Sequence, residues 1–300
     1  MKKKIVFAFI CCVLIVSTLS SCLPGVAVSL VEIGNNNTPR SVLLKYPGYT
    51  ETISYYVEDK ASYTYSIYIE NADHEKGINV CEKHSDSILY AYEGEIYMLS
   101  NSKLFAILQA SGTYAEYVER YMTFKSVFDE CTYYQTYSKK ITRNGKDVTE
   151  VCYEADPSNE VLAQASSLGI KPGDKLVSVY FIDNSTNLVE EVDYYYKSQT
   201  KDNQQSLFMK REFLYLSNKK EVFSILPTLD NTFSVNIVYN PGKEIESTSH
   251  YSIPKGCAIG IDTNGKNISF FEDAECTVPF NFNTYSASGK DEVFIYALYN

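Results

Sequence analysis

Histidine is the side chain that most often moves protons in catalysis, and this chain has three of them: His74, His84 and His250. None lies in a catalytic motif, because the sequence has no nucleophile elbow, no glycine-rich phosphate loop and no His-Glu-x-x-His pair. His74 stands in the polar segment NADHEKG and His250 in STSHYS, which predicts solvated loop positions for both. We therefore expect no enzyme activity and assign no catalytic residue.

Cys81 and His84 have the spacing of half a zinc site. On a strand, however, residues three apart point to opposite faces, and no second Cys-x-x-Cys or His pair completes four ligands. The turns DNSTN and DTNGKN lack the spaced ligands and the terminal Glu of a calcium loop. We therefore expect no metal and no other cofactor.

The N-terminal residues carry a targeting signal. Three lysines at positions 2–4 precede an unbroken apolar run over residues 5–16. As a helix this run reaches only about 18 Å, which is short of the ~30 Å hydrocarbon core of a membrane. A basic start, a short apolar middle and an end of small residues indicate a secretory signal peptide over residues 1–21, which is removed from the mature chain.

The end of this segment, Leu19-Ser20-Ser21-Cys22, resembles the lipobox of bacterial lipoproteins. In that family a fatty diacylglyceryl group, carrying chains such as palmitate, is attached to the cysteine thiol, and the cysteine becomes the first residue. The resemblance implies that Cys22 is a lipid attachment site and that the protein is lipid-anchored at the extracytoplasmic face of the cell membrane. Two or three acyl chains make detachment negligible at about 0.8 kcal/mol per buried CH₂. An ordinary secretory signal that contains a cysteine is the alternative.

The charge of the chain bears on its partners. Removal of residues 1–21 leaves 24 Lys and Arg against 37 Asp and Glu, so the formal net charge changes from −10 to −13. Such a composition offers no basic face for phosphate groups, so nucleic acid is not an expected partner. An acidic surface also disfavours a protein lying flat on anionic lipid.

Five cysteines besides Cys22 remain after the signal peptide, namely Cys81, Cys131, Cys152, Cys257 and Cys276. An odd number leaves at least one thiol unpaired, and the connectivity of any disulfides cannot be read from the sequence. The pair to test first is Cys257 with Cys276, because both fall in the C-terminal 70 residues.

The chain is expected to divide into a tether over residues 22–47 and two domains over residues 48–229 and 230–300. The tether has an Asn run with scattered Pro and Gly, and it predicts a spacer that lifts the folded part off the membrane. Residues 48–229 hold short alternating runs between turn residues, which predicts an antiparallel meander with a hairpin at Asn144-Gly145 and a last strand over residues 206–227. The 27 Tyr and 15 Phe favour sheet packing over the alternative of a carbohydrate site.

Two helices are expected within residues 48–229. Tyr114, Val118, Tyr121 and Met122 recur at helical spacing and predict a helix over residues 114–128. The second helix is predicted over residues 157–168, with Asp156 as its N-cap, and ends at Gly169.

This order of elements, together with the segment VYFIDNSTNLVEEVDYYY, resembles the LolA-like superfamily of lipoprotein carriers and lipid-binding lipoproteins. The resemblance implies a mainly β (α+β) fold, in which helices cover the concave side of a curved antiparallel half-barrel sheet and leave an apolar cavity. A soluble carrier has no lipobox, so a fixed receptor or acceptor role is expected rather than a shuttle.

An acyl chain or a lipidated protein is the ligand that such a cavity implies. The residues predicted to line the cleft are Tyr65, Ile67, Ile69, Leu89, Ile96 and Met98. If these side chains point one way, a curved sheet leaves an apolar cleft, in which Met is an adaptable contact. The alternative is that the two helices fill this space completely.

Residues 230–300 resemble one degenerate copy of the Listeria-Bacteroides repeat of the internalin B-repeat family. The matching positions are Pro254 to Gly256, Phe270 to Cys276, and Tyr296 to Tyr299. The resemblance implies a small β-grasp-like domain that docks a protein partner. The function expected first is therefore that of a non-catalytic lipoprotein that binds an apolar ligand, and the alternative is a cell-surface protein-interaction module.

Overall fold

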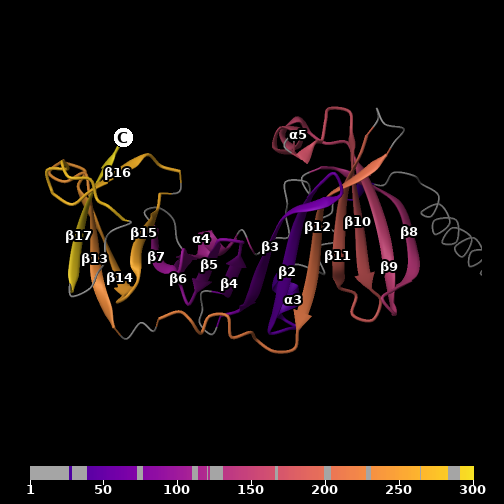
Figure 1. Cartoon of the computed structure of the whole chain (residues 1–300), viewed down its shortest axis with the longest axis horizontal. Helices are drawn as coiled ribbons and strands as arrows, with labels where there is room; N and C mark the ends of the chain where they lie inside the picture. The colour runs from indigo at the N-terminus through magenta and orange to yellow at the C-terminus, as the bar shows by residue number, and fades with distance from the viewer. Residues whose placement is uncertain are drawn as a thin grey trace, which may run out of the picture. The chain divides into compact units, whose positions relative to one another are not determined.

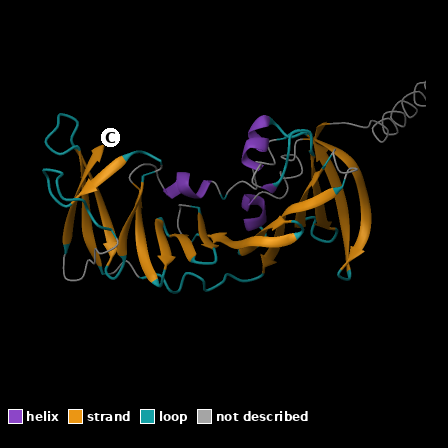
Figure 2. Cartoon of the chain, turned by 45° about the horizontal axis from the view of Figure 1, so that its top comes forward, coloured by secondary structure: helices purple, strands orange, loops and turns teal. Residues whose placement is uncertain are grey.

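The computed structural model describes residues 27–28, 39–72, 77–109, 114–119, 121, 131–165, 168–198, 204–227, 231–263, 265–282 and 291–300. The predicted signal peptide, Cys22 and His74 lie outside these residues. Strands make up most of the described chain, and its helices are few and short (Figure 2). The predicted mainly β fold class is therefore confirmed. Among the described residues, no helix is both long enough and apolar enough to cross a membrane.

The larger sheet is curved and open, and its strand order in the described chain is β1-β8-β9-β10-β11-β12-β2-β3-β4-β5-β6-β7-β15 (Figure 1). Neighbours from β8 to β12 and from β3 to β7 pair antiparallel, which confirms the predicted meander. The strands are β1 (Ala27–Val28), β2 (Gly48–Val57), β3 (Lys60–Asn71), β4 (Ile78–Lys83), β5 (Ser87–Tyr92), β6 (Glu95–Ser100), β7 (Lys103–Gln109), β8 (Tyr133–Arg143), β9 (Lys146–Ala155), β10 (Lys175–Asp183), β11 (Val189–Lys197), β12 (Gln205–Leu216) and β15 (Ala258–Asp262).

The predicted hairpin at Asn144-Gly145 joins β8 to β9. Both residues have positive φ angles, 51° for Asn144 and 76° for Gly145. A two-residue turn with two positive φ angles matches the right-handed twist of the flanking strands, and Asn and Gly adopt this conformation with little strain.

The smaller sheet has the order β14-β13-β17-β16. It consists of β13 (Thr232–Tyr239), β14 (Ser247–Pro254), β16 (Ile268–Phe271) and β17 (Glu292–Tyr299). Its first and last strands, β13 and β17, are parallel neighbours at the centre, which is the strand order of a β-grasp sheet. The resemblance to the Listeria-Bacteroides repeat stays a prediction.

The described chain forms two compact units that combine segments distant in sequence. Unit 1 includes Ser54–Tyr63 and Lys125–Glu212, and unit 2 includes Thr38–Ile53, Thr64–Phe124 and Phe213–Asn300. The expected boundary between residues 229 and 230 therefore falls inside unit 2. Strand β15 follows this boundary, yet it pairs in parallel with β7, which precedes it.

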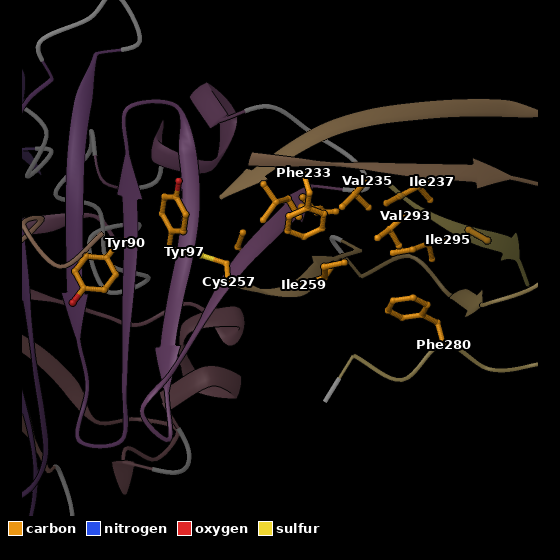
Figure 3. Close-up of a cluster of buried hydrophobic side chains, with 14 of the residues drawn as sticks. Tyr90, Tyr97, Phe233, Val235, Ile237, Cys257, Ile259, Phe280, Val293 and Ile295 are labelled. Carbon is orange, nitrogen blue, oxygen red and sulfur yellow. The ribbon is translucent and has the colours of Figure 1, made fainter. Parts of the chain in front are cut away.

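One face of β3 to β7 builds the core of unit 2. Cross-strand partners share a face of a sheet, and Tyr68, Cys81, Tyr90, Tyr97 and Ala106 stand in register across these five strands. They belong to one buried cluster with side chains of the smaller sheet and of β15 (Figure 3). Those side chains include Phe233, Val235, Ile237, Ile259, Val293 and Ile295. Residues before and after the predicted domain boundary therefore share a single core.

The strand predicted over residues 206–227 ends early, at Leu216. The chain then turns, and Phe223 enters the core of unit 2, where it stacks on Tyr92 with ring centroids 4.7 Å apart. Upstream of this ring, the Lys220 backbone N–H donates a hydrogen bond of 2.8 Å to the Tyr68 hydroxyl. Polar residues 217–221 break the strand pattern, and burial of Phe223 fixes the path of the connection.

The expected tether contains a helix, α3 (Pro39–Leu43), in which Val42 is fully buried. The second predicted helix, α5 (Asn159–Ala165), begins later than expected because its cap differs from the predicted one. Ser158, rather than Asp156, is the N-cap, since its hydroxyl oxygen accepts a hydrogen bond from the Val161 N–H. The helix also ends earlier than expected, at Ala165, and Gly169 lies four residues further on with a φ angle of 85°.

The five cysteines that were disulfide candidates are all free thiols. The pair to test first is therefore not bonded: Cys257 is buried in the core of unit 2, and Cys276 lies in an exposed turn. Burial raises the pKa of Cys81 and of Cys257 to about 11, so both thiols are neutral and poorly nucleophilic at neutral pH. Packing rather than redox chemistry accounts for their positions.

Candidate functional site

The side chains predicted to line a cleft lie on one face of strands β3 to β6, opposite to the core of unit 2. Glu82 pairs with Ile67 on one side and with Leu89 on the other, and Leu89 pairs with Met98. The next row along the strands holds Ile69 and Ile96, and Tyr65 precedes Ile67 by two residues. We call this surface the apolar face.

The apolar face continues beyond the predicted residues. Phe105 of β7 pairs with Met98, and Ala258 of β15 pairs with Phe105. Leu89, Met98 and Phe105 are only half-buried in the described part of the chain, whereas the Ile67 and Ile96 side chains are buried. A row of partly exposed apolar side chains therefore crosses β5, β6 and β7.

Helix α4 (Tyr114–Glu119) packs against the β4 end of the apolar face. Its Tyr114 hydroxyl donates a 2.8 Å hydrogen bond to the backbone oxygen of Ile78, and Val118 is buried. Tyr121 follows the helix and is buried as well. Residues 122–130 of the predicted helix lie outside the described chain. The helix thus covers β4, while the row from Leu89 to Phe105 keeps part of its surface exposed.

The apolar row ends at β4, next to a cluster of polar side chains. The Glu82 carboxylate accepts a hydrogen bond of 2.6 Å from His84 Nε2 and another from the Tyr121 hydroxyl. The Tyr65 ring stacks on the His84 imidazole, with centroids 5.0 Å apart. The Glu82 and His84 side chains are 18% and 24% exposed, so solvent and ligands still reach them. We call these four residues the polar end.

Sequence reasoning did not find the polar end. It considered His84 only together with Cys81, and these two side chains do lie on opposite faces, as predicted for residues three apart. The available signal was the pair Glu82 and His84, two residues apart on a strand and hence on one face. Among the described residues, no group of three or more His, Cys, Asp and Glu side chains is placed to hold a metal ion.

Unit 1 carries a second polar cluster, on β8, β11 and β12. Glu191 accepts hydrogen bonds from Arg143 at 2.8 Å and from Lys210 at 3.1 Å. Burial alone would raise the pKa of Glu191, but these two hydrogen bonds outweigh it and hold the pKa below its ordinary value. Burial, with the nearby Glu191 charge, raises the pKa of Asp193 to about 6. The Tyr195 hydroxyl donates a hydrogen bond of 3.1 Å to Oδ2 of Asp193.

The substitution Asp193→Asn should change how stability depends on pH. The folded protein holds the Asp193 proton more tightly than the unfolded chain, so the parent loses stability as the pH rises from about 4 to about 6. Asn does not titrate, so the free energy of unfolding of the variant should rise relative to the parent across this range and then level off. Urea unfolding at several pH values measures this difference, with the exposed Asp156→Asn as control. A difference that is independent of pH would contradict the assignment.

The outer face of the smaller sheet also brings polar and aromatic groups together. His250 lies on strand β14 rather than in the predicted loop, and its Nδ1 is hydrogen-bonded to the side-chain oxygen of Asn236. The Asn236 amide donates a 2.8 Å hydrogen bond to Glu292. Phe294 stands in register with Asn236 and is 47% exposed. These side chains point away from the core because they alternate with its residues along β13 and β17.

No family model matches the sequence, and no curated protein matches it. Several solved structures are similar in fold, among them the following three. The lipoprotein LppX of Mycobacterium tuberculosis has a TM-score of 0.37 and 7% identity, with 65% of this chain and 100% of LppX covered. A DUF1329 family protein of Desulfovibrio piger has a TM-score of 0.25 and 11% identity, with 64% and 92% covered.

The third similar structure is an outer membrane lipoprotein-sorting protein domain of Vibrio parahaemolyticus, with a TM-score of 0.25 and 9% identity over 64% of this chain and 94% of that domain. TM-scores and identities this low do not decide the family. The LolA-like class therefore stays a prediction, and the function proposed below rests on residues of this chain alone.

Proposed function

We propose that this protein is a non-catalytic lipoprotein, anchored by Cys22 at the extracytoplasmic face of the cell membrane, whose apolar face binds the acyl chain of a lipid or of a lipidated protein. The observation that carries the proposal is the half-buried row of Leu89, Met98 and Phe105, which ends at the polar end. Ligand sites of this kind combine a mostly apolar lining with a few convergent polar groups.

The row of apolar side chains supplies the affinity. Full burial of one large apolar side chain contributes about 1.5–3 kcal/mol of stabilisation relative to full exposure. Leu89, Met98 and Phe105 are already half-buried, so a ligand that covers them gains the remaining part. An acyl chain along β5 to β7 would complete their burial without any hydrogen bond of its own. Met98, at the centre, can adapt its rotamers to chains of different shape.

The polar end sets the chemistry of the head group. The Glu82 carboxylate has accepted two hydrogen bonds, and its oxygens have further acceptor capacity. A hydroxyl or ammonium group of the ligand would satisfy this capacity, whereas a phosphate or carboxylate would meet like charge. The ligand class expected is therefore an amphiphile whose head donates hydrogen bonds close to the start of its acyl chain.

The anchor is tested by labelling and fractionation. Labelled palmitate should enter the parent protein and not the Cys22→Ser variant, which should also leave the membrane fraction. A parent that takes up no label, together with a Cys22→Ser variant that is processed and fractionates like the parent, would end the anchor proposal.

Native mass spectrometry of the chain produced without residues 1–21 tests the apolar face. The parent should retain an added neutral diacylglycerol, and Met98→Gln should lose most of it, because an amide in the row must give up hydrogen bonds to water. The matched control is Leu214→Gln, since Leu214 is 59% exposed and lies off this face. Equal retention by both variants, or none by the parent, would reject the proposed ligand site.

The alternative function, docking of a protein partner by the C-terminal part, is favoured by one observation. Phe294 is 47% exposed beside the His250, Asn236 and Glu292 side chains, and an exposed aromatic ring with polar neighbours is typical of protein interfaces. A photo-crosslinking residue at position 294 should then give a discrete adduct in intact cells. The same residue at the exposed position 245 should not, and the absence of any adduct at position 294 counts against this function.

A further inference from the structure

We infer that one exposed face of β8, the face that carries Tyr134, Tyr137 and Lys139, lies against the membrane to which the N-terminus is anchored. This inference rests on the proposed lipid at Cys22, and it goes beyond that proposal by naming the surface that meets the bilayer. It also revises the expected role of residues 22–47 as a spacer that lifts the folded part off the membrane.

The length of chain between the lipid and the sheet limits their separation. Strand β1 pairs with the start of β8, with Ala27 opposite Tyr134 and Val28 opposite Tyr133. Ala27 follows Cys22 by five residues, and an extended chain spans at most about 3.6 Å per residue, so their α-carbons lie within about 18 Å. Part of this length is needed to pass the lipid head groups, whose layer is about 5–8 Å deep on each side. The start of β8 must therefore stay close to the bilayer surface.

The side chains of β8 suit this position. Its pairing with β9 shifts between Gln135 and Tyr137, and this bulge brings Tyr134, Tyr137 and Lys139 to the same face, because all three oppose alternate residues of β9. Tyr134 and Tyr137 are 43% and 41% exposed. Tyrosine is enriched at membrane–water interfaces, where its ring is buried among the head groups and its hydroxyl stays hydrated.

The charge of β8 also favours contact with the membrane. The strand carries Lys139, Lys140 and Arg143 and has no acidic residue, in a chain whose formal net charge is −13 without residues 1–21. Lys139 pairs with Glu150 at 2.9 Å, yet its side chain remains 54% exposed while the Glu150 side chain is only 12% exposed. The Lys139 ammonium thus lies outside its carboxylate partner, whereas Arg143 pairs with Glu191. Each basic side chain near an anionic membrane contributes about 1 kcal/mol of attraction, so β8 differs from the acidic remainder of the chain in its affinity for lipid.

The described part of the chain leaves this strand accessible. In the strand order, β8 has only β1 and β9 as neighbours, and β1 pairs with no residue of β8 beyond Tyr134. Residues 134–140 are exposed to solvent. An edge strand with these properties could also accept a strand from another protein, and charged side chains such as Lys are the usual means of preventing that. The short link to the lipid favours the bilayer as the occupant.

Fluorescence quenching in vesicles tests the inference. The chain has no tryptophan, so a single Trp reports on its own surroundings. The lipidated full chain with Tyr137→Trp is placed in vesicles of phosphatidylglycerol and phosphatidylcholine whose acyl chains carry bromine. Its emission should shift to shorter wavelength and lose most of its intensity, compared with vesicles that lack bromine.

The matched control is Tyr63→Trp. Tyr63 is 42% exposed and belongs to the same unit, and its strand β3 is six positions from β8 in the sheet, or about 29 Å along it. Its emission should be the same with and without bromine. Two results would overturn the inference and leave the anchor standing, provided that the protein floats with the vesicles. In the first, Tyr137→Trp is not quenched; in the second, both reporters are quenched equally. A full chain that is processed in cells, carries no lipid and does not float with vesicles would overturn the anchor and the inference together.

Discussion

Residues 230–300, produced as a fragment on their own, should remain unfolded, with no cooperative thermal transition. The reason is that this part of the chain shares its core with residues that precede it. Ile259 of β15 is fully buried next to Ala106, and β15 has its only described strand partner in β7. In the fragment, the β15 edge and the side chains that pack on Tyr97 and Leu108 would be exposed to water.

The comparison for this fragment is the chain of residues 39–300, which retains all three segments of unit 2 except Thr38 and should unfold cooperatively. Circular dichroism on heating and the dispersion of amide signals in an NMR spectrum distinguish the two outcomes. A fragment with a well-dispersed spectrum and a sharp transition would show instead that residues 230–300 are an independent domain, as the repeat resemblance implies.

The second large effect is expected for Phe223→Ala, which should lower the free energy of unfolding by about 3–5 kcal/mol. The Phe223 ring is 7% exposed and lies within aromatic contact of Tyr68, Tyr90 and Tyr92. Truncation removes its buried area and leaves a cavity in the core of unit 2. It also releases the connection between β12 and β13, which has no strand or helix of its own in the described chain.

Urea unfolding measures this loss as a lower midpoint. The neighbouring Ile225→Ala is the matched control, because Ile225 is 55% exposed and its truncation should change the free energy of unfolding by about 0.5 kcal/mol or less. Similar midpoints for the two variants would mean that Phe223 does not hold the connection in place.

The strands of this protein could be predicted because their signals are local. Alternating apolar and polar residues mark β3 to β12, and the turn at Asn144-Gly145 needs only its own two positive φ angles. The shared face of Tyr65, Ile67 and Ile69 follows from the two-residue period of a strand. Adding Leu89 and Met98 to that face required only that neighbouring strands pair as hairpins.

Element ends were harder to predict than element types. Asp156 and Ser158 are both good N-caps, and only the Ser158 hydroxyl reaches the free N–H of Val161. The strand predicted to run through residue 227 ends at Leu216, because burial of Phe223 in a distant core outweighs the local pattern. In both places, two local structures were acceptable, and a contact that the sequence pattern does not reveal decided between them.

The sequence by itself therefore determined the β class and the antiparallel meander, while the export signal and its lipid site stay predictions. Only the tertiary structure decided that β15 joins β7, that Tyr121 reaches Glu82, and that β1 lies beside the start of β8. These contacts join residues far apart in the chain. The periodicity of a sequence records which way each side chain points along its own strand, and it carries no record of which distant strand will cover it.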